Sequence, residues 1–548
     1  MNIVSSNTIY SKKVEEQPFN EIRKIHGSHI ISSDYPAYLV DESKLEGTAA
    51  WLFFPKSETE IISIINYLRE KKIPTYISAA RTGIVGSSVP ICGSIFSIEK
   101  MDKMLGLGFD ENRRLYFCRF EPGITLKAIN EKLLKKEVEE VEELTPNTIS
   151  RFMEEKKSYY YPMDPTEMSA SISGTVATNA SGAGTFKYGA TRKWVKKIRV
   201  ALSFGEILEI QRGKYFASND GTFIIKQTDG TDIVFKIPSY EFNTNVKNVA
   251  GIYAKPNMDL IDLFIGSEGI FGVITEVEVW ILEKHPLISN VLFFNSEDDA
   301  LDFVKKIRNN QTVNPEFIEY FSGESLDLLR NVQSKNPTLI NMPQIPFKAR
   351  SAIFFDLPYS ENNLIPYFEK IGKLAKQCNT TLETSWSGYD NREFARFKHF
   401  RHVLPETVNT IIAERKRHYP DLHKLGTDMC VPEEKLDEMM KYYHSILREA
   451  ALEYVIFGHI GDNHVHLNIL PKNTEELEHG LKIYKLFAEK AVEYGGSVSA
   501  EHGIGKIKIE FLKFMYCEEE IEQMRAVKRA LDPLLLFNSG NIFESKAV

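Results

Sequence analysis

One stretch constrains the fold more than any other: nearly all of the roughly 20 residues from Ser169 onward are Gly, Ala, Ser, Thr or Asn. Side chains this small let the backbone approach another backbone or a ligand closely, at an entropic cost that an ordinary loop need not bear. A second such segment, 79–88, contains ARTGIVGSS and follows the strand predicted for IPTYISA. The two segments predict either a ligand cradle made of backbone amides or a pair of packing turns.

The common nucleotide-binding fingerprints are absent from the chain. No G-x-x-x-x-G-K-[ST] occurs, which excludes a P-loop. The nearest approaches to G-x-G-x-x-G are Gly182-Ala-Gly184 and Gly503-Ile-Gly505, and a lysine stands where each third glycine is needed. Two loops of small residues at strand ends can still hold a long pyrophosphate-bearing ligand, because amide hydrogens in successive turns form anion nests.

Composition and charge indicate a globular protein without an overall excess of basic residues. The 548 residues are 43% apolar and 26% charged, and the net charge of −8 is dispersed, so nothing indicates a nucleic-acid partner. Five scattered cysteines, none in a C-x-x-C pair, argue against a disulfide framework, an iron–sulfur module or a cysteine zinc site and favour a reducing compartment. Neither a signal peptide nor an apolar run of about 18 residues is present, so we expect a cytoplasmic protein, with peripheral docking on the inner face of a membrane left open.

Hydrophobic periodicity predicts an α+β fold. In SETEIISIINYLREKK, Ser57 and Glu60 form a capping box ahead of an apolar helical face. Residues 131–157 are dense in charge, which predicts a solvated helix within a surface excursion. From about 285 to 500, strands alternate with polar-capped helices, which predicts an antiparallel sheet covered by helices on one face.

A cluster of histidines indicates specific chemistry. His459, His464 and His466 lie in FGHIGDNHVHLNIL, and a four-residue loop would place His459 directly opposite His466, with their Cβ atoms about 5 Å apart. Two such imidazoles can share one divalent metal, to which Glu501 and His502 of VSAEHGIG could add a carboxylate and a further imidazole. The alternative is a set of unrelated histidines in a polar hairpin.

The basic, aromatic segment 391–432 offers a carboxylate-binding group. Arg401 stands on an aromatic-rich helical face before Pro405, where its guanidinium could clamp a small carboxylate in a bidentate geometry. Surface solvation accounts for most of its basic neighbours, and Lys398, Arg415 and Lys416 receive no assignment.

Several motifs together resemble one family of flavoenzymes. In chain order they are ARTGIVGSSVP, YPMDPTEMSASISGTVATNASGAGTFKYGATRKWV, DLFIGSEGIFGVITEVEVWIL, FGHIGDNHVHLNIL, SAEHGIG and NSGNIF. Over residues 45–543 the chain is similar to the FAD-dependent D-2-hydroxyacid dehydrogenases, the family of D-lactate dehydrogenase (cytochrome) and the glycolate oxidase D subunit. The resemblance implies an N-terminal extension at 1–44, a vanillyl-alcohol oxidase (PCMH-type) FAD-binding domain at 45–284, and an FAD-linked oxidase C-terminal domain at 285–548. The last has a ferredoxin-like antiparallel sheet, and its tail from about 505 returns to the FAD domain.

The resemblance also implies roles for individual residues. His459, His466 and Glu501 match the family's divalent metal ligands, which bind zinc or manganese. His502 matches its catalytic base and Arg401 its carboxylate-binding arginine. The expected FAD contacts are Arg81, Thr82, Gly83, Gly86, Ser87, Ser88, Pro162, Asp164, Thr166, Ser173, Gly174, Thr178, Asn179, Gly182, Gly266, Glu268, Gly269 and Val273.

The chain departs from the family at points that bear on cofactor and substrate. Its first loop carries fewer glycines than in relatives, which puts some backbone contacts to FAD in doubt. A threonine of hydroxyglutarate-type members is Pro405 here. Lys424 lies near, but slightly out of register with, their substrate lysine, and with Arg401 it is a candidate substrate-binding residue. These departures argue against hydroxyglutarate and favour D-lactate or glycolate. Neither FAD loop contains a histidine, so we expect a non-covalent flavin.

The implied function is oxidation of a small D-2-hydroxy acid to the 2-oxo acid by hydride transfer to flavin. Without a cysteine cluster, the electrons must pass to an external acceptor, such as a cytochrome, a quinone or an electron-transfer flavoprotein. One alternative is another flavoenzyme of this fold, a sugar-alcohol or lactone oxidase or an alkyl-glycerone-phosphate synthase type, which would not need the histidines and the glutamate. The other is a non-catalytic flavoprotein subunit.

Overall fold

A four-stranded sheet and the helix that covers it form one layer of the N-terminal part. The computed structural model describes residues 6–138, 140–164, 167–310, 312–333, 335, 343–360 and 363–544. Helix α2 (Glu58–Lys71) begins as the capping box predicts, because Ser57 Oγ accepts a hydrogen bond from the Glu60 amide. Its apolar face is buried with Phe53 and Phe96 of the sheet. In sheet order the strands are β2 (Lys24–His26), β3 (Trp51–Phe53), β5 (Ser94–Ser97) and β4 (Thr75–Ser78).

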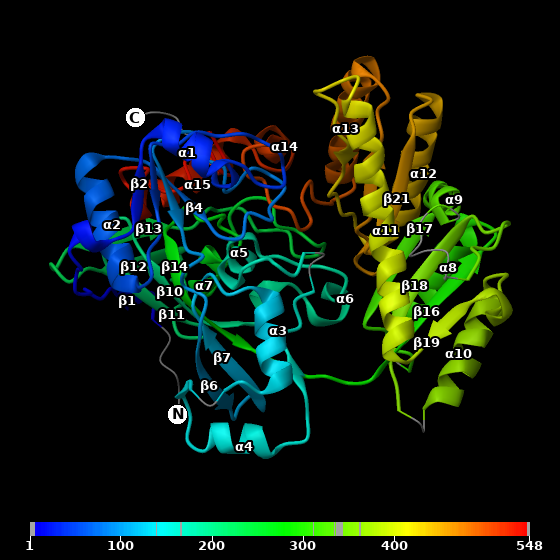
Figure 1. Cartoon of the computed structure of the whole chain (residues 1–548), viewed down its shortest axis with the longest axis horizontal. Coiled ribbons are helices and arrows are strands. Elements are labelled where there is room, and N and C mark those ends of the chain that lie inside the picture. The colour runs from blue at the N-terminus through cyan, green and yellow to red at the C-terminus, as the bar shows by residue number, and fades with distance from the viewer. Residues whose placement is uncertain are drawn as a thin grey trace.

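A six-stranded sheet forms the second layer of this part (Figure 1). In sheet order its strands are β11 (Ile207–Gln211), β10 (Val195–Ala201), β14 (Val273–Trp280), β7 (Leu115–Phe120), β6 (Met104–Asp110) and β8 (Glu142–Glu143). The charged stretch 131–157 contains a helix end, β8 and a second helix, and Leu133 and Phe152 anchor it in the core. The helices here are α3 (Leu126–Lys135), α4 (Thr148–Glu154), α5 (Ile172–Thr178), α6 (Thr185–Tyr188) and α7 (Ile261–Phe264).

Residues 6–44 belong to these layers. Strand β1 (Thr8–Tyr10) pairs in parallel with β12 (Thr222–Lys226), which pairs with β13 (Asp232–Lys236), while β2 pairs with β3. Ile9 and Ile31, the latter on α1 (Ser28–Asp34), are buried. The described part of the predicted N-terminal extension thus packs on the first domain, where its apolar side chains add to the core.

The C-terminal part is built on a seven-stranded sheet in which every pair is antiparallel. In sheet order the strands are β19 (Trp386–Gly388), β16 (Leu287–Phe294), β18 (Ser351–Pro358), β17 (Phe317–Ser322), β21 (Tyr454–Gly458), β22 (His466–Ile469) and β20 (Leu425–Gly426). Its helices are α8 (Glu297–Arg308), α9 (Gly323–Gln333), α10 (Leu364–Gln377), α11 (Asn391–Lys416), α12 (Leu436–Glu449) and α13 (Thr474–Glu493). The antiparallel sheet agrees with the pattern of the sequence.

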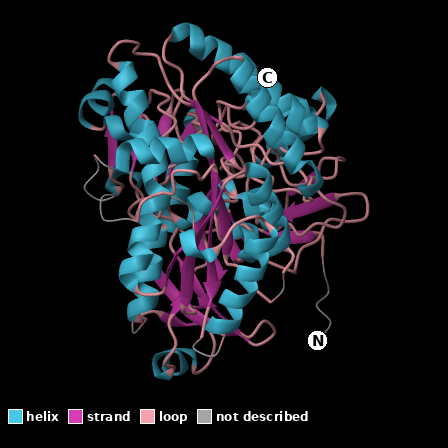
Figure 2. Cartoon of the chain, turned by 90° about the vertical axis from the view of Figure 1, so that its right-hand side faces the viewer, coloured by secondary structure: helices cyan, strands magenta, loops and turns pink. Residues whose placement is uncertain are grey.

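Helices cover both faces of this sheet, so the prediction of cover on one face is wrong. Alternate residues of each strand point to opposite faces. Leu292 and Phe355 are buried with α8, whereas Phe293 and Phe354 are buried with α9 and α11 in a separate cluster. Figure 2 shows the strands running between helices on either side.

The chain returns to the N-terminal part at its C-terminal end. After α14 (Ile509–Met515) and α15 (Glu518–Leu531), the Thr75 amide at the start of β4 donates to Leu536 O at 2.6 Å, and the Asn538 amide donates to Thr75 O at 2.9 Å. In Figure 1 these red helices lie among the blue and cyan elements rather than with the yellow and orange ones. No helix in the described ranges is both long and apolar enough to cross a membrane.

Candidate functional site

The first small-residue loop follows β4 and presents unused backbone donors. None of the hydrogen bonds among the described residues uses the N–H group of Ser87 or Ser88 as a donor, and the Ser88 hydroxyl is buried without a partner. Arg81 braces the loop, because its guanidinium donates to Ser78 Oγ and lies 4.3 Å from the centre of the Tyr38 ring. Unused amide and hydroxyl donors at the end of a strand suit an anionic group such as a pyrophosphate.

The second small-residue segment lies beside the first. A Cβ atom placed on Gly174 would be 3.8 Å from Ala79 Cβ, and the Gly266 amide donates to Val176 O at 3.0 Å. The structure thus brings together the three segments around 79–88, 172–182 and 266–273. Thr166 lies outside the described residues.

Three of the expected FAD residues have side chains engaged elsewhere. The buried Glu268 carboxylate accepts hydrogen bonds from Ser87 Oγ at 2.5 Å and from the Gly505 amide at 2.8 Å, so it faces the C-terminal segment. Burial raises the pKa of Glu268. Val273 is part of the hydrophobic core, and Asp164 Oδ2 lies 3.7 Å from an Arg401 nitrogen. Apart from Pro162 and Thr166, the other assigned residues lie along the converging segments.

The histidines come together by a different register from the one expected. His466 of β22 pairs with Phe457, two residues before His459. Strand β21 ends at Gly458, whose φ of +119° favours glycine, and a 3-10 turn at Ile460–Asp462 follows. His459 therefore lies in the connection, and the prediction that it pairs directly with His466 is wrong. The two ring centroids nevertheless lie 5.2 Å apart.

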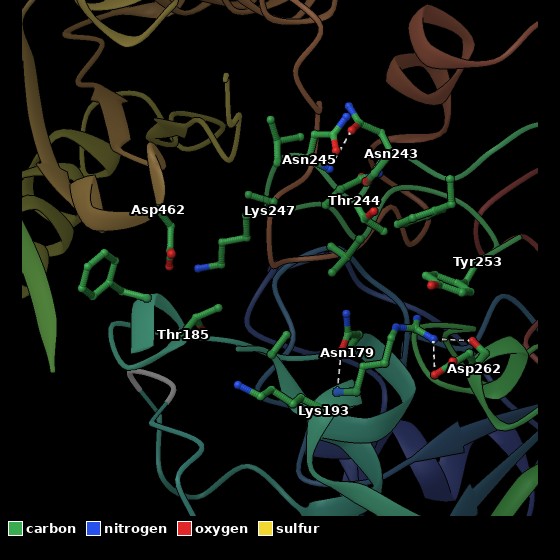
Figure 3. A pocket seen from close by; sticks show the side chains of 18 of the residues that line it. Asn179, Thr185, Lys193, Asn243, Thr244, Asn245, Lys247, Tyr253, Asp262 and Asp462 are labelled. Carbon is green, nitrogen blue, oxygen red and sulfur yellow. Dashed lines mark hydrogen bonds and ion pairs between the residues drawn. The ribbon is translucent and has the colours of Figure 1, made fainter. Parts of the chain in front are cut away.

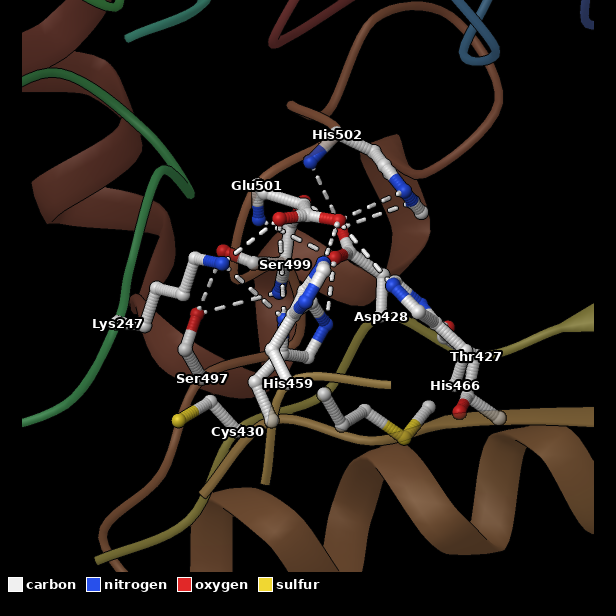
Figure 4. Close-up of polar contacts among 12 residues, drawn as sticks. Lys247, Thr427, Asp428, Cys430, His459, His466, Ser497, Ser499, Glu501 and His502 are labelled. Carbon is white, nitrogen blue, oxygen red and sulfur yellow. Dashed lines mark hydrogen bonds and ion pairs between the residues drawn. The ribbon is translucent and has the colours of Figure 1, made fainter. Parts of the chain in front are cut away.

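Glu501 completes a set of converging ligand atoms (Figure 4). Its Oε1 lies 3.4 Å from His459 Nε2 and 3.2 Å from His466 Nε2. One ligand atom from each of these residues and from the fully buried His464 lies within 4.8 Å of the others. Imidazole nitrogens and a carboxylate oxygen at this spacing fit a divalent ion such as zinc or manganese.

Glu319 of β17 links this cluster to Arg401. Its Oε1 lies 2.6 Å from His459 Nδ1 and 3.6 Å from Arg401 Nη2. Burial opposes charge on both Glu319 and His459, but their mutual attraction outweighs it, so the pKa of Glu319 falls to about 2 and that of His459 rises to about 9. A metal ion on His459 Nε2 would replace the proton, while Glu319 continued to orient the ring through Nδ1.

Asp428 organises the loop that carries Glu501 and His502. Its fully buried carboxylate accepts hydrogen bonds from the amides of both residues, at 3.1 and 3.0 Å, and from the Lys508 ammonium group at 2.7 Å. His502 Nδ1 lies 3.4 Å from Asp428 Oδ2, and its ring stacks 5.5 Å from that of His466. Burial lowers the pKa of His502 to about 4, so its imidazole is neutral at pH 7 and able to accept a proton.

Described contacts link Arg401 to the cluster, whereas none of them links Lys424 to it. Arg401 lies on α11, which continues through Pro405, and its side chain is only 15% exposed. Lys424 precedes β20, where burial lowers its pKa, and no described hydrogen bond or ion pair connects it to the histidines. The structure therefore brings together Arg401, His459, His466, Glu501 and His502.

Comparisons with known proteins agree with this architecture. Residues 147–211 match the FAD binding domain family, and residues 288–542 match the family of FAD linked oxidases, C-terminal domain. The chain thus contains an FAD binding domain segment and an FAD-linked oxidase C-terminal domain. The predicted α+β fold and the expected FAD-dependent oxidoreductase class are thus confirmed.

Relatives of this chain match most of its length but at low identity. It is 26% identical to D-lactate dehydrogenase of Anaerostipes hadrus, covering 89% of this chain and 88% of that one. It is 25% identical to D-2-hydroxyglutarate dehydrogenase of Stutzerimonas stutzeri, covering 90% of both chains, and 25% identical to glycolate oxidase subunit GlcD of Bacillus subtilis, covering 90% and 88%.

Two solved structures share the fold. An alkyldihydroxyacetonephosphate synthase aligns with a TM-score of 0.59 at 14% identity, over 98% of this chain and 89% of that one. A p-cresol methylhydroxylase aligns with a TM-score of 0.62 at 13% identity, over 94% and 93%.

A cavity of about 810 Å³ is lined by residues 242–249, by the turn at 461–463 and by residues such as Asn179 and Thr185 of the second small-residue segment and its continuation (Figure 3). Lys247 points into it opposite Asp462 and also donates to Glu501 Oε2 at 2.7 Å. The N-terminal half therefore holds one oxygen of Glu501 through Lys247, which leaves Oε1 facing the histidines.

Sequence reasoning missed four residues of this site. Glu319 is the only charged residue of the apolar strand FIEYFS, and a lone charge in such a strand could have indicated a functional residue. Asp428 and Lys247 stand in segments without any distinguishing pattern, and their roles depend on contacts between distant parts of the chain. His464 was noticed within the motif but received no role as a ligand.

Proposed function

We propose that this FAD-dependent oxidoreductase oxidises a small D-2-hydroxy acid, D-lactate or glycolate, to the corresponding 2-oxo acid. The observation that carries the proposal is the convergence of the His459–His466–Glu501 set with a neutral His502 and with Arg401. A metal-ligand set, a base and a guanidinium suit a substrate with a carboxylate and an adjacent hydroxyl. The relatives named D-lactate dehydrogenase and glycolate oxidase subunit GlcD support this substrate class.

The side chains divide the work of the reaction. Arg401 binds the substrate carboxylate, and Glu319 holds Arg401 and His459 in place. His502 accepts the hydroxyl proton at Nε2, the nitrogen turned away from Asp428, and the amide bonds to Asp428 fix the loop that carries it. Bound FAD supplies the hydride acceptor, and a zinc or manganese ion at His459, His466 and Glu501 supplies a Lewis acid for the α-oxygen.

The surroundings of Arg401 favour a substrate with one carboxylate. Lys424, which is slightly out of register with the substrate lysine of hydroxyglutarate-type members, has no hydrogen bond or ion pair to the cluster among the described residues. Pro405, on the next turn of α11 after Arg401, has no hydroxyl to offer a second carboxylate. Both features support D-lactate or glycolate over hydroxyglutarate.

Once reduced, a bound FAD would need a separate electron acceptor. Cys92, Cys118, Cys378, Cys430 and Cys517 are all free, and no cysteine takes part in a group of potential metal ligands among the described residues. The chain thus provides no cysteine-held iron–sulfur relay in that part. A cytochrome, a quinone or an electron-transfer flavoprotein fits this role.

A panel of D- and L-2-hydroxy acids, assayed with a dye acceptor before and after chelation, tests the proposal. We expect anaerobic flavin bleaching and dye reduction with D-lactate or glycolate, no reaction with L-lactate, and loss of activity on chelation that zinc or manganese restores. Reduction only by polyols or lactones would favour the alternative flavoenzyme, and a flavin that no substrate reduces would favour a non-catalytic subunit. Activity that resists complete removal of metal would contradict the role of the histidine cluster.

A further inference from the structure

The C-terminal segment forms hydrogen bonds to one side of the first small-residue loop. The Lys506 ammonium group donates to Gly86 O at 2.9 Å and lies 3.4 Å from Ser87 O. The Asn541 side-chain amide donates to Ser87 O at 2.9 Å, and the Lys506 main-chain amide donates to Val85 O at 2.9 Å. Three successive carbonyl groups of the loop are thus bound by residues more than 400 positions later in the chain.

These bonds determine where the loop directs its amide hydrogens. In a planar trans peptide the C=O and the following N–H point in opposite directions. Fixing the Gly86 and Ser87 carbonyls toward the C-terminal segment therefore turns the N–H groups of Ser87 and Ser88 away from it. These are the amide groups that find no acceptor among the described residues.

The C-terminal segment that binds the loop consists of two stretches, 503–507 and 538–542, which are hydrogen-bonded to each other. Lys506 Nζ donates to Asn541 Oδ1 at 2.6 Å, and the Ile542 amide donates to Gly505 O at 3.0 Å. A Cβ atom on Gly505 would lie 2.1 Å from Val85 O, so only glycine permits this close approach to the loop. Asn541 is 1% exposed, which leaves its amide little freedom to turn.

We propose that Lys506 and Asn541 are positioning residues for the cofactor, which hold the first loop so that its free amides face the FAD pyrophosphate. The C-terminal segment is then part of the FAD site although it needs no contact with FAD. The charge of Lys506, close behind the loop, adds to the attraction for the phosphates. The proposal rests on the assignment of 81–88 as an FAD loop.

The test compares FAD release from the purified holoenzyme and its variants. Lys506→Met keeps the aliphatic stem and removes the donor, and we expect FAD to dissociate at least tenfold faster, with the dissociation constant raised by a similar factor. Asn541→Leu should act in the same direction, and Lys506→Arg should restore part of the affinity because it keeps charge and donors. Lys513→Met is the matched control, since the Lys513 ammonium pairs with Glu510 on the surface of α14, and it should release FAD at the wild-type rate.

Two further measurements keep the outcome decisive. Hydrogen exchange of the wild-type protein should slow at 503–507 and 538–542 when FAD is present, and this readout remains even if a variant fails to fold. The proposal would be overturned if both Lys506→Met and Asn541→Leu bound FAD within twofold of the wild-type affinity. It would also be overturned if hydrogen exchange in these two segments had the same rate with and without FAD. Gly83→Val distinguishes the assignment of 81–88 as an FAD loop from the positioning role of Lys506. If Gly83→Val weakens FAD binding and Lys506→Met does not, the loop assignment stands and the positioning role fails. Unchanged binding in both overturns both.

Discussion

The two halves of the site are built from different parts of the polypeptide. In the N-terminal half the converging segments offer main-chain groups, such as the free amides of Ser87 and Ser88. In the C-terminal half, side-chain atoms of His459, His466 and Glu501 meet. A main-chain site should tolerate the loss of a side chain and suffer from the gain of one, whereas a side-chain site should behave in the opposite way.

The strongest expected effect falls on the side-chain half. His459→Ala removes a proposed metal ligand and leaves Glu319 without its closest partner. Because a Lewis acid contributes several kcal/mol, we expect the rate of flavin reduction to fall on the order of 10³-fold, together with loss of bound zinc or manganese. Stopped-flow absorbance and elemental analysis measure the two effects.

The matched control for this substitution is His479→Ala, an exposed histidine on α13. It should leave metal content and flavin reduction unchanged. Full metal occupancy in His459→Ala would show that the convergence of these side chains is not a metal site.

A smaller effect is expected from a residue that organises the side-chain half without reacting. Asp428→Asn keeps the shape of the side chain but weakens the bonds that fix the amides of Glu501 and His502. Mutation of a residue that orients a metal ligand or a catalytic group lowers activity about 10- to 100-fold. We therefore expect the rate of flavin reduction to fall by that factor, with FAD content unchanged. Asp437→Asn, on the surface of α12, is the control. Equal rates of flavin reduction in Asp428→Asn and Asp437→Asn would show that Asp428 does not position Glu501 and His502.

The sequence allowed the side-chain half to be predicted residue by residue because chemistry there depends on residue type. His459, His466, Glu501, His502 and Arg401 were each predicted and lie close together in the structure, and their roles stay predictions; the hairpin register expected for His459 was wrong by two residues. The error arose because Gly458 ends the strand early, and a glycine of positive φ cannot be distinguished from an ordinary one in a single sequence.

The main-chain half could be predicted only as segments. Small residues indicate close approach but do not say which amide is free. Glu268 illustrates the limit, because its carboxylate faces Gly505, a partner 237 positions away. The helical cover on both faces of the second sheet was likewise missed, since alternation of strands and helices does not record on which face each helix lies.

Within the main-chain half, the gain of a side chain should have the larger effect. A Cβ atom on Gly83 would have Asp41 Oδ2 at 3.9 Å as its nearest neighbour, so the chain has room for it. We expect Gly83→Val to raise the dissociation constant for FAD about tenfold, roughly 1.4 kcal/mol, because the branched side chain stands where the loop approaches the cofactor. Fluorescence of released FAD measures this. Gly83→Ala should fall between wild type and valine, and wild-type affinity in both variants would show that the loop surface does not contact FAD.

The smallest effects are expected where side chains are lost from the same loop. Ser88→Ala removes a hydroxyl without a protein partner, and Ser87→Ala removes the donor that Glu268 Oε2 accepts at 2.5 Å. If the amides bind the phosphates, both variants should retain FAD affinity within about threefold. Only Ser87→Ala should lower the free energy of unfolding, by about 1–3 kcal/mol, since it leaves a buried carboxylate short of a hydrogen bond. A tenfold loss of affinity in Ser88→Ala would mean that a side chain binds the phosphate, and the contrast between the two halves would no longer hold.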